Sequence, residues 1–180
     1  MDGGVVLNVR YPIGQLNLPT SITLKAIHQW LDEIEGYVQN LKEVVGNLSE
    51  KEYHQTYREG SYTVRQLVHH IADSQINMYY RLKMALTDNQ LKIAEFQQDV
   101  WVQLPDYQLP VDISIQLLEM INKRIIAIGR QLSESDLTRT FLLEGTGEIS
   151  VGETIAKLSW HERHHLAHIQ IALGKSEVSL

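Results

Sequence analysis

Six of the eight histidines in this chain of 180 residues fall into two short clusters. One cluster is the pair His69–His70, and the other is the segment 161–168, which contains the remaining four. Histidine is only a moderate helix former, so helix propensity does not explain this crowding. Neutral imidazole is a common ligand of divalent transition metals. The clusters therefore predict a metal site, and the choice of ligands depends on how the helices present them.

Helical geometry separates the two histidines of the first cluster. The apolar face of the helix that contains them is formed by Val64, Leu67, Ile71 and Met78. At roughly 100° per residue, His70 lies at the edge of this face, about 60° from Leu67. His69 points almost the opposite way. We therefore expect His70 to point into the protein and His69 to be solvated.

The second cluster offers an inward pair of histidines four residues apart. The apolar face of its helix is formed by Ile155, Leu158, Leu166, Ile169 and Leu173. His161 and His165 flank one side of this face about 40° apart, so their rings lie one turn apart and can bind one ion. Together with His70 they form a three-histidine site for one divalent metal ion per chain. Such a site suits Zn²⁺ with positions open for water or substrate, and Ni²⁺, Fe²⁺ and Mn²⁺ are alternatives.

Other polar residues near these histidines leave alternatives open. His164 and His168 form a competing pair, which is less favoured because His164 faces away from the apolar face; His168 lies on the ligand side and is a candidate to orient a ligand. Glu162 falls within the apolar face, where an unpaired carboxylate is costly. It is a candidate general base or ligand partner, and the structural alternative is a buried ion pair or hydrogen bond with another helix. Asp73, one turn after His70, is a weaker candidate partner of a ligand.

Four amphipathic segments are long enough to position these side chains on helices. Apolar residues recur at spacings of three and four over residues 23–48, 64–86, 113–132 and 151–173. Thr63 with Gln66, and Ser150 with Glu153, have the form of capping boxes. Gly174 is typical of the residue that follows a helix. Four long helices with few strand signals predict an all-α four-helix bundle.

The remaining segments predict smaller features. Residues 1–20 contain three glycines and two prolines without a sustained period, and we expect an irregular arm over the surface. A short helix is expected over 96–102. A glycine-centred turn between apolar flanks predicts a small hairpin over 141–149. No repeat or linker divides the chain, so we expect a single domain over residues 1–180.

Composition excludes several classes of function. The formal net charge is −6 and no basic cluster forms a stripe, so nucleic acid is not an expected partner. Cysteine is absent, which excludes disulfides, a thiolate nucleophile and cysteine-containing zinc sites. The N-terminus lacks the features of a signal peptide, and the apolar runs are too short to span a bilayer. We therefore expect a cytoplasmic protein with no membrane partner.

Three segments of the chain resemble a known family. Residues 11–14 (YPIG), 63–74 (TVRQLVHHIADS) and 160–169 (WHERHHLAHI) resemble the YfiT group of metal-dependent hydrolases within the DinB-like superfamily. The resemblance implies a DinB-like four-helix bundle, usually a homodimer, whose metal is held by three histidines. These map to His70, His161 and His165, the same residues that helical geometry selected. The group often has Gly-Gly-Trp where this chain has Gly-Ser-Tyr at residues 60–62, a departure in a loop that we expect to border the pocket.

Three hypotheses for function follow from the residues and the resemblance. The first is a hydrolase in which a metal-bound water attacks a small-molecule substrate and Glu162 accepts a proton. The second is a thiol S-transferase, because related DinB-like proteins resemble enzymes that conjugate low-molecular-weight thiols such as bacillithiol. The third is a non-catalytic, metal-stabilised dimeric bundle. It requires a closed coordination shell, completed for example by His168 or Glu162.

Overall fold

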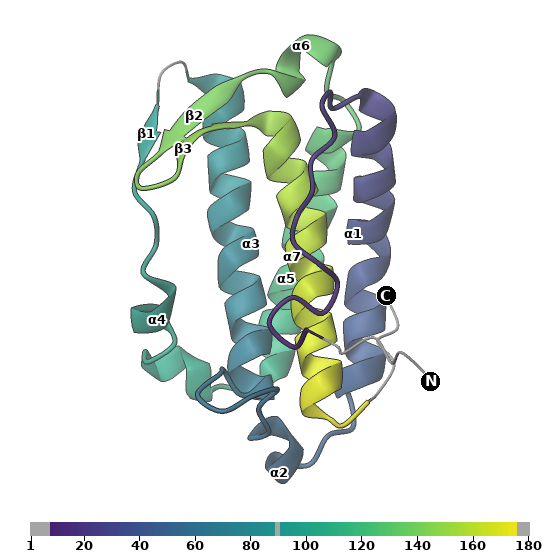
Figure 1. Cartoon of the computed structure of the whole chain (residues 1–180), viewed down its shortest axis with the longest axis vertical. Coiled ribbons are helices and arrows are strands. Elements are labelled where there is room, and N and C mark those ends of the chain that lie inside the picture. Colours follow the sequence, from purple (N-terminus) through teal and green to yellow (C-terminus); the bar gives the residue numbers. More distant parts are fainter. Residues whose placement is uncertain (1–7, 89–90, 176–180) are drawn as a thin grey trace, which may run out of the picture.

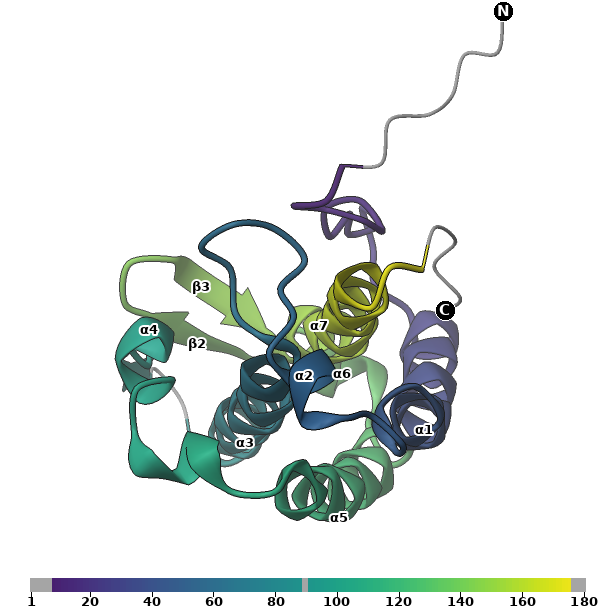
Figure 2. The same ribbon diagram turned by 90° about the horizontal axis from the view of Figure 1, so that it is seen from below.

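The computed structural model describes residues 8–88 and 91–175 and contains, in that part of the chain, four long helices arranged as a bundle (Figure 1). They are α1 (Leu24–Val45), α3 (Val64–Thr87), α5 (Val111–Gly129) and α7 (Val151–Ala172). Helices α1 and α3 each pack mainly against α5 and α7, so α1 and α3 lie diagonally opposite each other (Figure 2). The predicted all-α bundle is confirmed. Its consequence for the site is that α3 and α7, which carry the two histidine clusters, are neighbours.

Local side-chain chemistry explains where the site helices begin. The Thr63 hydroxyl accepts a hydrogen bond from the backbone N–H of Gln66, and the Gln66 side chain accepts one from the N–H of Thr63. Ser150 and Glu153 make the same reciprocal pair before α7. Both predicted capping boxes are confirmed, and each satisfies backbone donors that the first helical turn leaves free. Because the capping boxes fix where α3 and α7 begin, they support the helical positions assigned to the histidines on both helices.

The other two long helices differ from their predicted bounds by a few residues. Helix α1 ends at Val45 rather than residue 48, because Gly46 follows it as the C-cap. Helix α5 begins at residue 111 rather than 113, directly after Pro110, whose fixed φ suits a helix start. It ends at Gly129, three residues early. A Cβ at Gly129 would lie 2.7 Å from both δ carbons of Leu31, so this glycine permits the close approach of α1 and α5.

Short elements fill the connections between the long helices. The helical ones are α2 (Glu50–Tyr53), α4 (Gln98–Trp101), η1 (Pro105–Gln108) and α6 (Glu134–Leu137). The strands are β1 (Lys92–Ile93), β2 (Thr140–Leu143) and β3 (Gly147–Ser150). Strands β2 and β3 form the predicted antiparallel hairpin, and its turn includes Gly145 with a φ of 78°. Strand β1 pairs parallel to β2 and was not predicted, because two residues carry no periodic signal.

The core consists of two apolar clusters separated by a polar layer. One cluster lies toward the end of the bundle that holds the sheet, and the other lies toward the opposite end. Between them lie three buried polar side chains from different helices, namely Gln75 on α3, Asn122 on α5 and Glu162 on α7. Gln75 donates to Asn122 at 2.9 Å, and Asn122 donates to Glu162 at 2.7 Å. This layer links α3, α5 and α7 by hydrogen bonds rather than by apolar contact alone.

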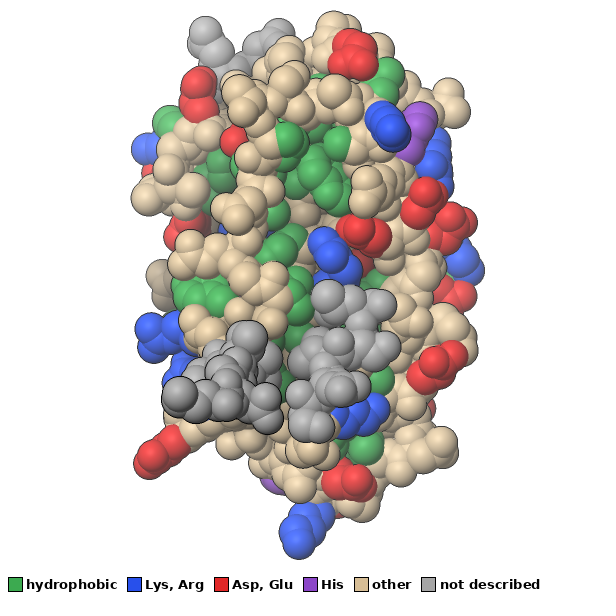
Figure 3. Space-filling model, turned by 45° about the vertical axis from the view of Figure 1, so that its right-hand side comes forward, with side chains coloured by type: hydrophobic (Ala, Val, Ile, Leu, Met, Phe, Trp, Pro, Cys, Tyr) green, Lys and Arg blue, Asp and Glu red, His purple; other side chains and the backbone are tan. Residues whose placement is uncertain are grey.

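The predicted N-terminal arm runs along the outside of α7 (Figure 1). The Trp160 indole N–H donates to the backbone oxygen of Gly14 at 3.3 Å. Residues 1–7 of the predicted arm lie outside the described residues. On the face toward α1, acidic and basic side chains are interspersed (Figure 3). Within the described residues, no helix has both the length and the apolar character needed to cross a membrane.

Candidate metal centre

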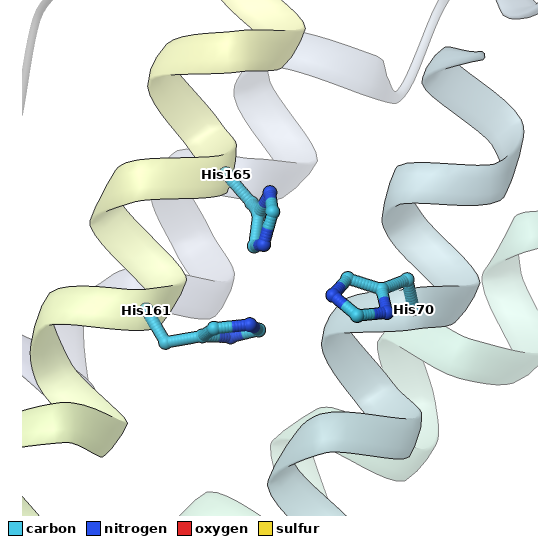
Figure 4. A group of neighbouring side chains, drawn as sticks. All are labelled: His70, His161 and His165. Atoms are coloured by element: carbon cyan, nitrogen blue, oxygen red, sulfur yellow. The ribbon is translucent and has the colours of Figure 1, made fainter. Parts of the chain in front are cut away.

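The structure brings together the three histidines selected from the sequence (Figure 4). His70 projects from α3 toward His161 and His165 on α7. The ring centroid of His70 lies 5.3 Å from that of His161 and 4.9 Å from that of His165, and the last two centroids are 4.4 Å apart. One ring nitrogen from each residue lies within 4.8 Å of the others. Two adjacent helices thus present three nitrogen donors to one point.

The surroundings keep these imidazoles neutral. His70 is 2% exposed, and burial lowers its pKa to about 4, although the charge of Asp99 acts in the opposite direction. Burial lowers the pKa values of His161 and His165 well below the usual value, and the neighbouring histidines lower them further. A neutral imidazole has a free nitrogen lone pair, so the three rings are in the state that binds metal.

Unsatisfied nitrogen atoms test whether the site fits a metal. Among the described residues, the buried Nδ1 atoms of His70 and His161 have no hydrogen-bond partner. A buried polar atom without a partner is costly, and native proteins leave few of them. Three convergent neutral imidazoles form a donor set that zinc and related ions accept. The residues present therefore fit a divalent transition metal.

His168 lies behind His165. The Nδ1 atoms of the two rings are 3.3 Å apart, so one of them donates to the other. When His165 is the donor, its Nε2 is left free as a ligand atom, which is the usual arrangement for a metal-binding histidine. The ring of His168 stacks on Tyr57 with centroids 3.8 Å apart. His168 thus lies where it can hold the orientation of His165, the role considered for it from the sequence.

The competing histidine pair forms a second group with His165. One nitrogen each from His164, His165 and His168 lies within 4.8 Å of the others. His164 stacks on Trp160 with centroids 4.3 Å apart, as its predicted direction implied. It is nevertheless only 7% exposed, because the N-terminal arm places Tyr11 beside it.

Glu162 and Asp73 do not line the cavity beside the three histidines, where a general base would have to lie. Glu162 is 1% exposed and accepts from Asn122 in the polar layer, and it is not among the residues that line the cavity beside the histidines. Burial raises its pKa well above the usual value. A hydrogen bond with another helix, the structural alternative, is what the fold contains. Asp73 accepts a hydrogen bond from Tyr107 at 2.7 Å and does not line the cavity either.

The prediction that His69 is solvated is wrong. His69 is 5% exposed, because η1 and the residue that follows it fold over this side of α3. Its Nε2 donates to the backbone oxygen of Leu109 at 3.1 Å, and its Nδ1 accepts from the Ser114 hydroxyl at 2.7 Å. Both ring nitrogens are therefore satisfied by structural hydrogen bonds, which leaves His70 as the candidate metal ligand of this pair.

A cavity of about 970 Å³ opens beside the three histidines. Its walls come from α3, α7, the loop before α3, the segment around α4 and the end of β2. Figure 2 shows that loop, α4 and the hairpin on the same side of the bundle. Aromatic side chains line it, namely Tyr57, Tyr62, Phe96 and Trp160. The loop of residues 60–62 lines the cavity too, as expected from its departure from the family pattern.

Five charged side chains also line the cavity, and sequence reasoning identified none of them. They are Arg58, Arg81, Glu95, Asp99 and Lys157. Two had a detectable signal, since Arg81 follows His70 on the same helical face and Lys157 precedes His161 by one turn. Asp99 accepts a hydrogen bond from the Tyr62 hydroxyl. It had no such signal, because a segment between helices has no periodicity that says where it folds.

Comparisons with known proteins agree with the fold and find relatives named for metal-dependent hydrolysis. The family model of the DinB superfamily matches residues 34–169. A protein of Oceanobacillus iheyensis that carries the provisional name of a metal-dependent hydrolase is 51% identical over 173 residues, covering 96% of this chain and 100% of that protein. A similarly named protein of Halalkalibacterium halodurans is 41% identical, covering 93% of this chain and 98% of that protein.

A solved structure shows the same likeness. It is YfiT from Bacillus subtilis, described as a probable metal-dependent hydrolase with an unusual four-helix bundle topology. The two structures superpose with a TM-score of 0.87 at 31% sequence identity, over 94% of this chain and 99% of the other. The four-helix bundle of this chain therefore has the architecture of a solved structure. The chain belongs to the DinB superfamily, as a YfiT-type member.

Proposed function

We propose that this protein is a metal-dependent hydrolase whose single zinc ion is held by His70, His161 and His165. The observation that carries the proposal is the convergence of three neutral imidazoles beside a cavity of about 970 Å³. Three protein ligands with an open side are typical of catalytic zinc, whereas structural zinc has four. Bound zinc supplies a water that ionises near neutral pH and polarises a substrate oxygen. Ni²⁺, Fe²⁺ and Mn²⁺ accept the same donors and belong in the same test.

The chain itself offers a proton acceptor in the cavity, which we assign to Asp99. One of its carboxylate oxygens accepts a hydrogen bond from the Tyr62 hydroxyl. Burial raises the pKa of Tyr62, so the phenol keeps its proton and holds the carboxylate in place. The charge of Asp99 also acts on His70, which supports its closeness to the metal site. Asp99, rather than Glu162, is therefore the carboxylate to take a proton from the attacking water.

The aromatic residues of the cavity bind the body of the substrate. Phe96 and Trp160 line it, and Phe96 is braced edge-on by Trp101 with ring centroids 5.0 Å apart. Apolar walls exclude water from the reacting bond and strengthen the electrostatic contacts around it. The substrate is a small molecule that fits this volume. The homodimer expected for the family and a single domain over the whole chain stay predictions.

A thiol S-transferase is the second candidate. The observation that favours it is the set of three basic side chains in the cavity, Arg58, Arg81 and Lys157, which suits a small anionic thiol. The non-catalytic bundle is less well supported. It needs a fourth protein ligand, and the two residues considered for it, Glu162 and His168, do not line the cavity.

The decisive experiment measures hydrolysis against metal content. Protein purified without an affinity tag or chelator is analysed for metals, stripped, reloaded with each ion and assayed on a panel of small esters, amides and lactones. We expect activity to rise in proportion to metal up to one ion per chain. A fully loaded protein that hydrolyses nothing would overturn the proposal. Turnover that appears only when a low-molecular-weight thiol is added would assign the transferase instead.

A further inference from the structure

Arg81 is a half-buried cation that lines the cavity, with Glu95 as the nearby opposite charge. In the part of the chain that the structure describes, its guanidinium forms no hydrogen bond and no ion pair. Burial lowers its pKa, and Glu95 is the charge that acts against this effect. Removing a guanidinium from water without pairing it costs free energy. An anionic group from outside the chain that paired with Arg81 would offset this cost.

The other charged side chains of the cavity differ in their hydrogen bonding, and Arg58 donates to the backbone oxygen of Glu59 at 3.3 Å. Lys157, like Arg81, has no hydrogen-bond or ion-pair partner among residues 8–88 and 91–175. In contrast, Glu95 accepts a hydrogen bond from the Thr146 hydroxyl, and Asp99 accepts one from the Tyr62 hydroxyl. Hydrogen bonds from neutral hydroxyls leave both carboxylates charged, so three basic and two acidic side chains give the cavity a formal charge of +1 in a protein whose net charge is −6. Such a local reversal of charge concentrates anions at the site.

Helix geometry places Arg81 and Lys157 toward one end of the cavity and the three histidines toward the other. His70, Ser74, Met78 and Arg81 line the cavity at successive turns of α3. At a rise of 1.5 Å per residue, the Cα atoms of His70 and Arg81 are about 16 Å apart along the helix. Helix α7 runs antiparallel to α3, so Lys157, one turn before His161, lies toward the same end as Arg81.

We propose that Arg81 and Lys157 bind an oxyanion group of the substrate, a carboxylate or a phosphate, so that the hydrolase acts on anionic small molecules. This inference rests on the proposed function and names the substrate class of the same site. The guanidinium is planar and matches two oxygens of such a group at once, and the lysine ammonium adds a point charge. With the anionic end held there, the rest of the molecule extends along α3 toward the three histidines. The bond to be cleaved would then lie near the metal.

Matched metal-binding probes test this substrate class without requiring turnover. Three linear hydroxamates of equal chain length are titrated calorimetrically into zinc-loaded protein, one ending in a methyl group, one in a carboxylate and one in a phosphonate. The hydroxamate binds the metal, and only the far end differs. We expect at least one anionic probe to bind about tenfold to hundredfold more tightly than the methyl probe. Comparison of carboxylate with phosphonate identifies the preferred oxyanion.

Three charge-removing variants locate the effect. Arg81→Gln and Lys157→Gln are expected to lose most of the preference for the anionic probe and to bind the methyl probe as the wild type does. Lys83→Gln removes an exposed charge from the same helix outside the cavity and should keep the preference. Zinc content and the thermal transition of each variant are measured in parallel. Because Lys157 is exposed, its variant remains informative even when Arg81→Gln does not fold.

The outcomes separate this inference from the proposed function. Equal binding of all three probes to the wild type, or a preference that survives in both cavity variants, overturns the anion site while the metal centre stands. Failure of the methyl probe to bind zinc-loaded protein overturns the open metal centre, and the anion site falls with it.

Discussion

Replacing His161 with alanine is the sharpest test of the metal centre, because it removes one of three donors and little else. The ring of His161 contacts the other two histidines, and its Nδ1 has no hydrogen-bond partner among the described residues. The metal-free variant should therefore have nearly the stability of the metal-free wild type. The difference between the two proteins should emerge only when metal is added.

The size of that difference follows from linkage. A ligand that binds only the folded state, present at a hundredfold excess over its dissociation constant, stabilises the protein by about 2.7 kcal/mol. For a domain of this size, each kcal/mol shifts Tm by about 2–4 °C. Zinc should therefore raise the Tm of the wild type by about 5–11 °C. With two ligands left, His161→Ala should show little of this rise and should retain much less than one zinc per chain.

The assay is thermal unfolding in buffered zinc and in chelator, with metal content measured on the same samples. His28→Ala is the control, since His28 is an exposed histidine on α1 far from the cavity residues. It should keep both the metal and the full zinc-dependent rise. A His161→Ala protein that still gains several degrees with zinc would refute the three-histidine site. So would a wild type that takes up no metal.

The remaining predictions concern the three carboxylates that compete for a role. Glu162→Gln keeps the hydrogen bond to the polar layer and should retain metal and kcat/KM within about threefold, whereas a general base contributes about a hundredfold or more. Asp99→Asn should keep the metal and lower kcat by about a hundredfold; full activity in this variant would remove Asp99 from the mechanism. Asp73→Asn should alter the pH dependence of stability, because burial raises the pKa of Asp73 above its ordinary 3.8 despite the hydrogen bond from Tyr107. A raised carboxyl pKa means that this group's contribution is present below the unfolded pKa and is lost as pH rises through the folded one. The wild type should thus lose unfolding free energy relative to Asp73→Asn as pH rises above about 4. Chemical denaturation between pH 4 and 7 measures this, and parallel curves would contradict it.

Local signals in the sequence were enough to predict the positions of the four long helices. The capping boxes at Thr63 and Ser150 fixed the starts of α3 and α7, because a side chain within three residues satisfies the free backbone donors. Apolar residues at spacings of three and four identified the four long helices. Where α1 and α5 differ from prediction, the cause is a proline or glycine at the end of the helix.

The same helical count selected His70, His161 and His165, because a rise and a rotation per residue are enough to say which side chains share a face. The helical count could not predict which other segments of the chain cover each face of a helix. His69 was expected in solvent and is buried under η1. For Glu162 the sequence left open a general base, a ligand partner or a buried hydrogen bond with another helix, and the structure contains the hydrogen bond to α5. Both outcomes depend on contacts between segments far apart in the chain.

The sequence alone thus determined the four long helices, the candidate metal ligands and the helix face on which each of them lies, since these follow from interactions within a few residues. Only the tertiary structure decided that α3 and α7 are neighbours, that a cavity opens beside their histidines, and that Asp99 and Arg81 line it. The physical reason is that helix periodicity is a local property, whereas the packing of helices and loops minimises exposed apolar area and unpaired polar groups over the whole chain.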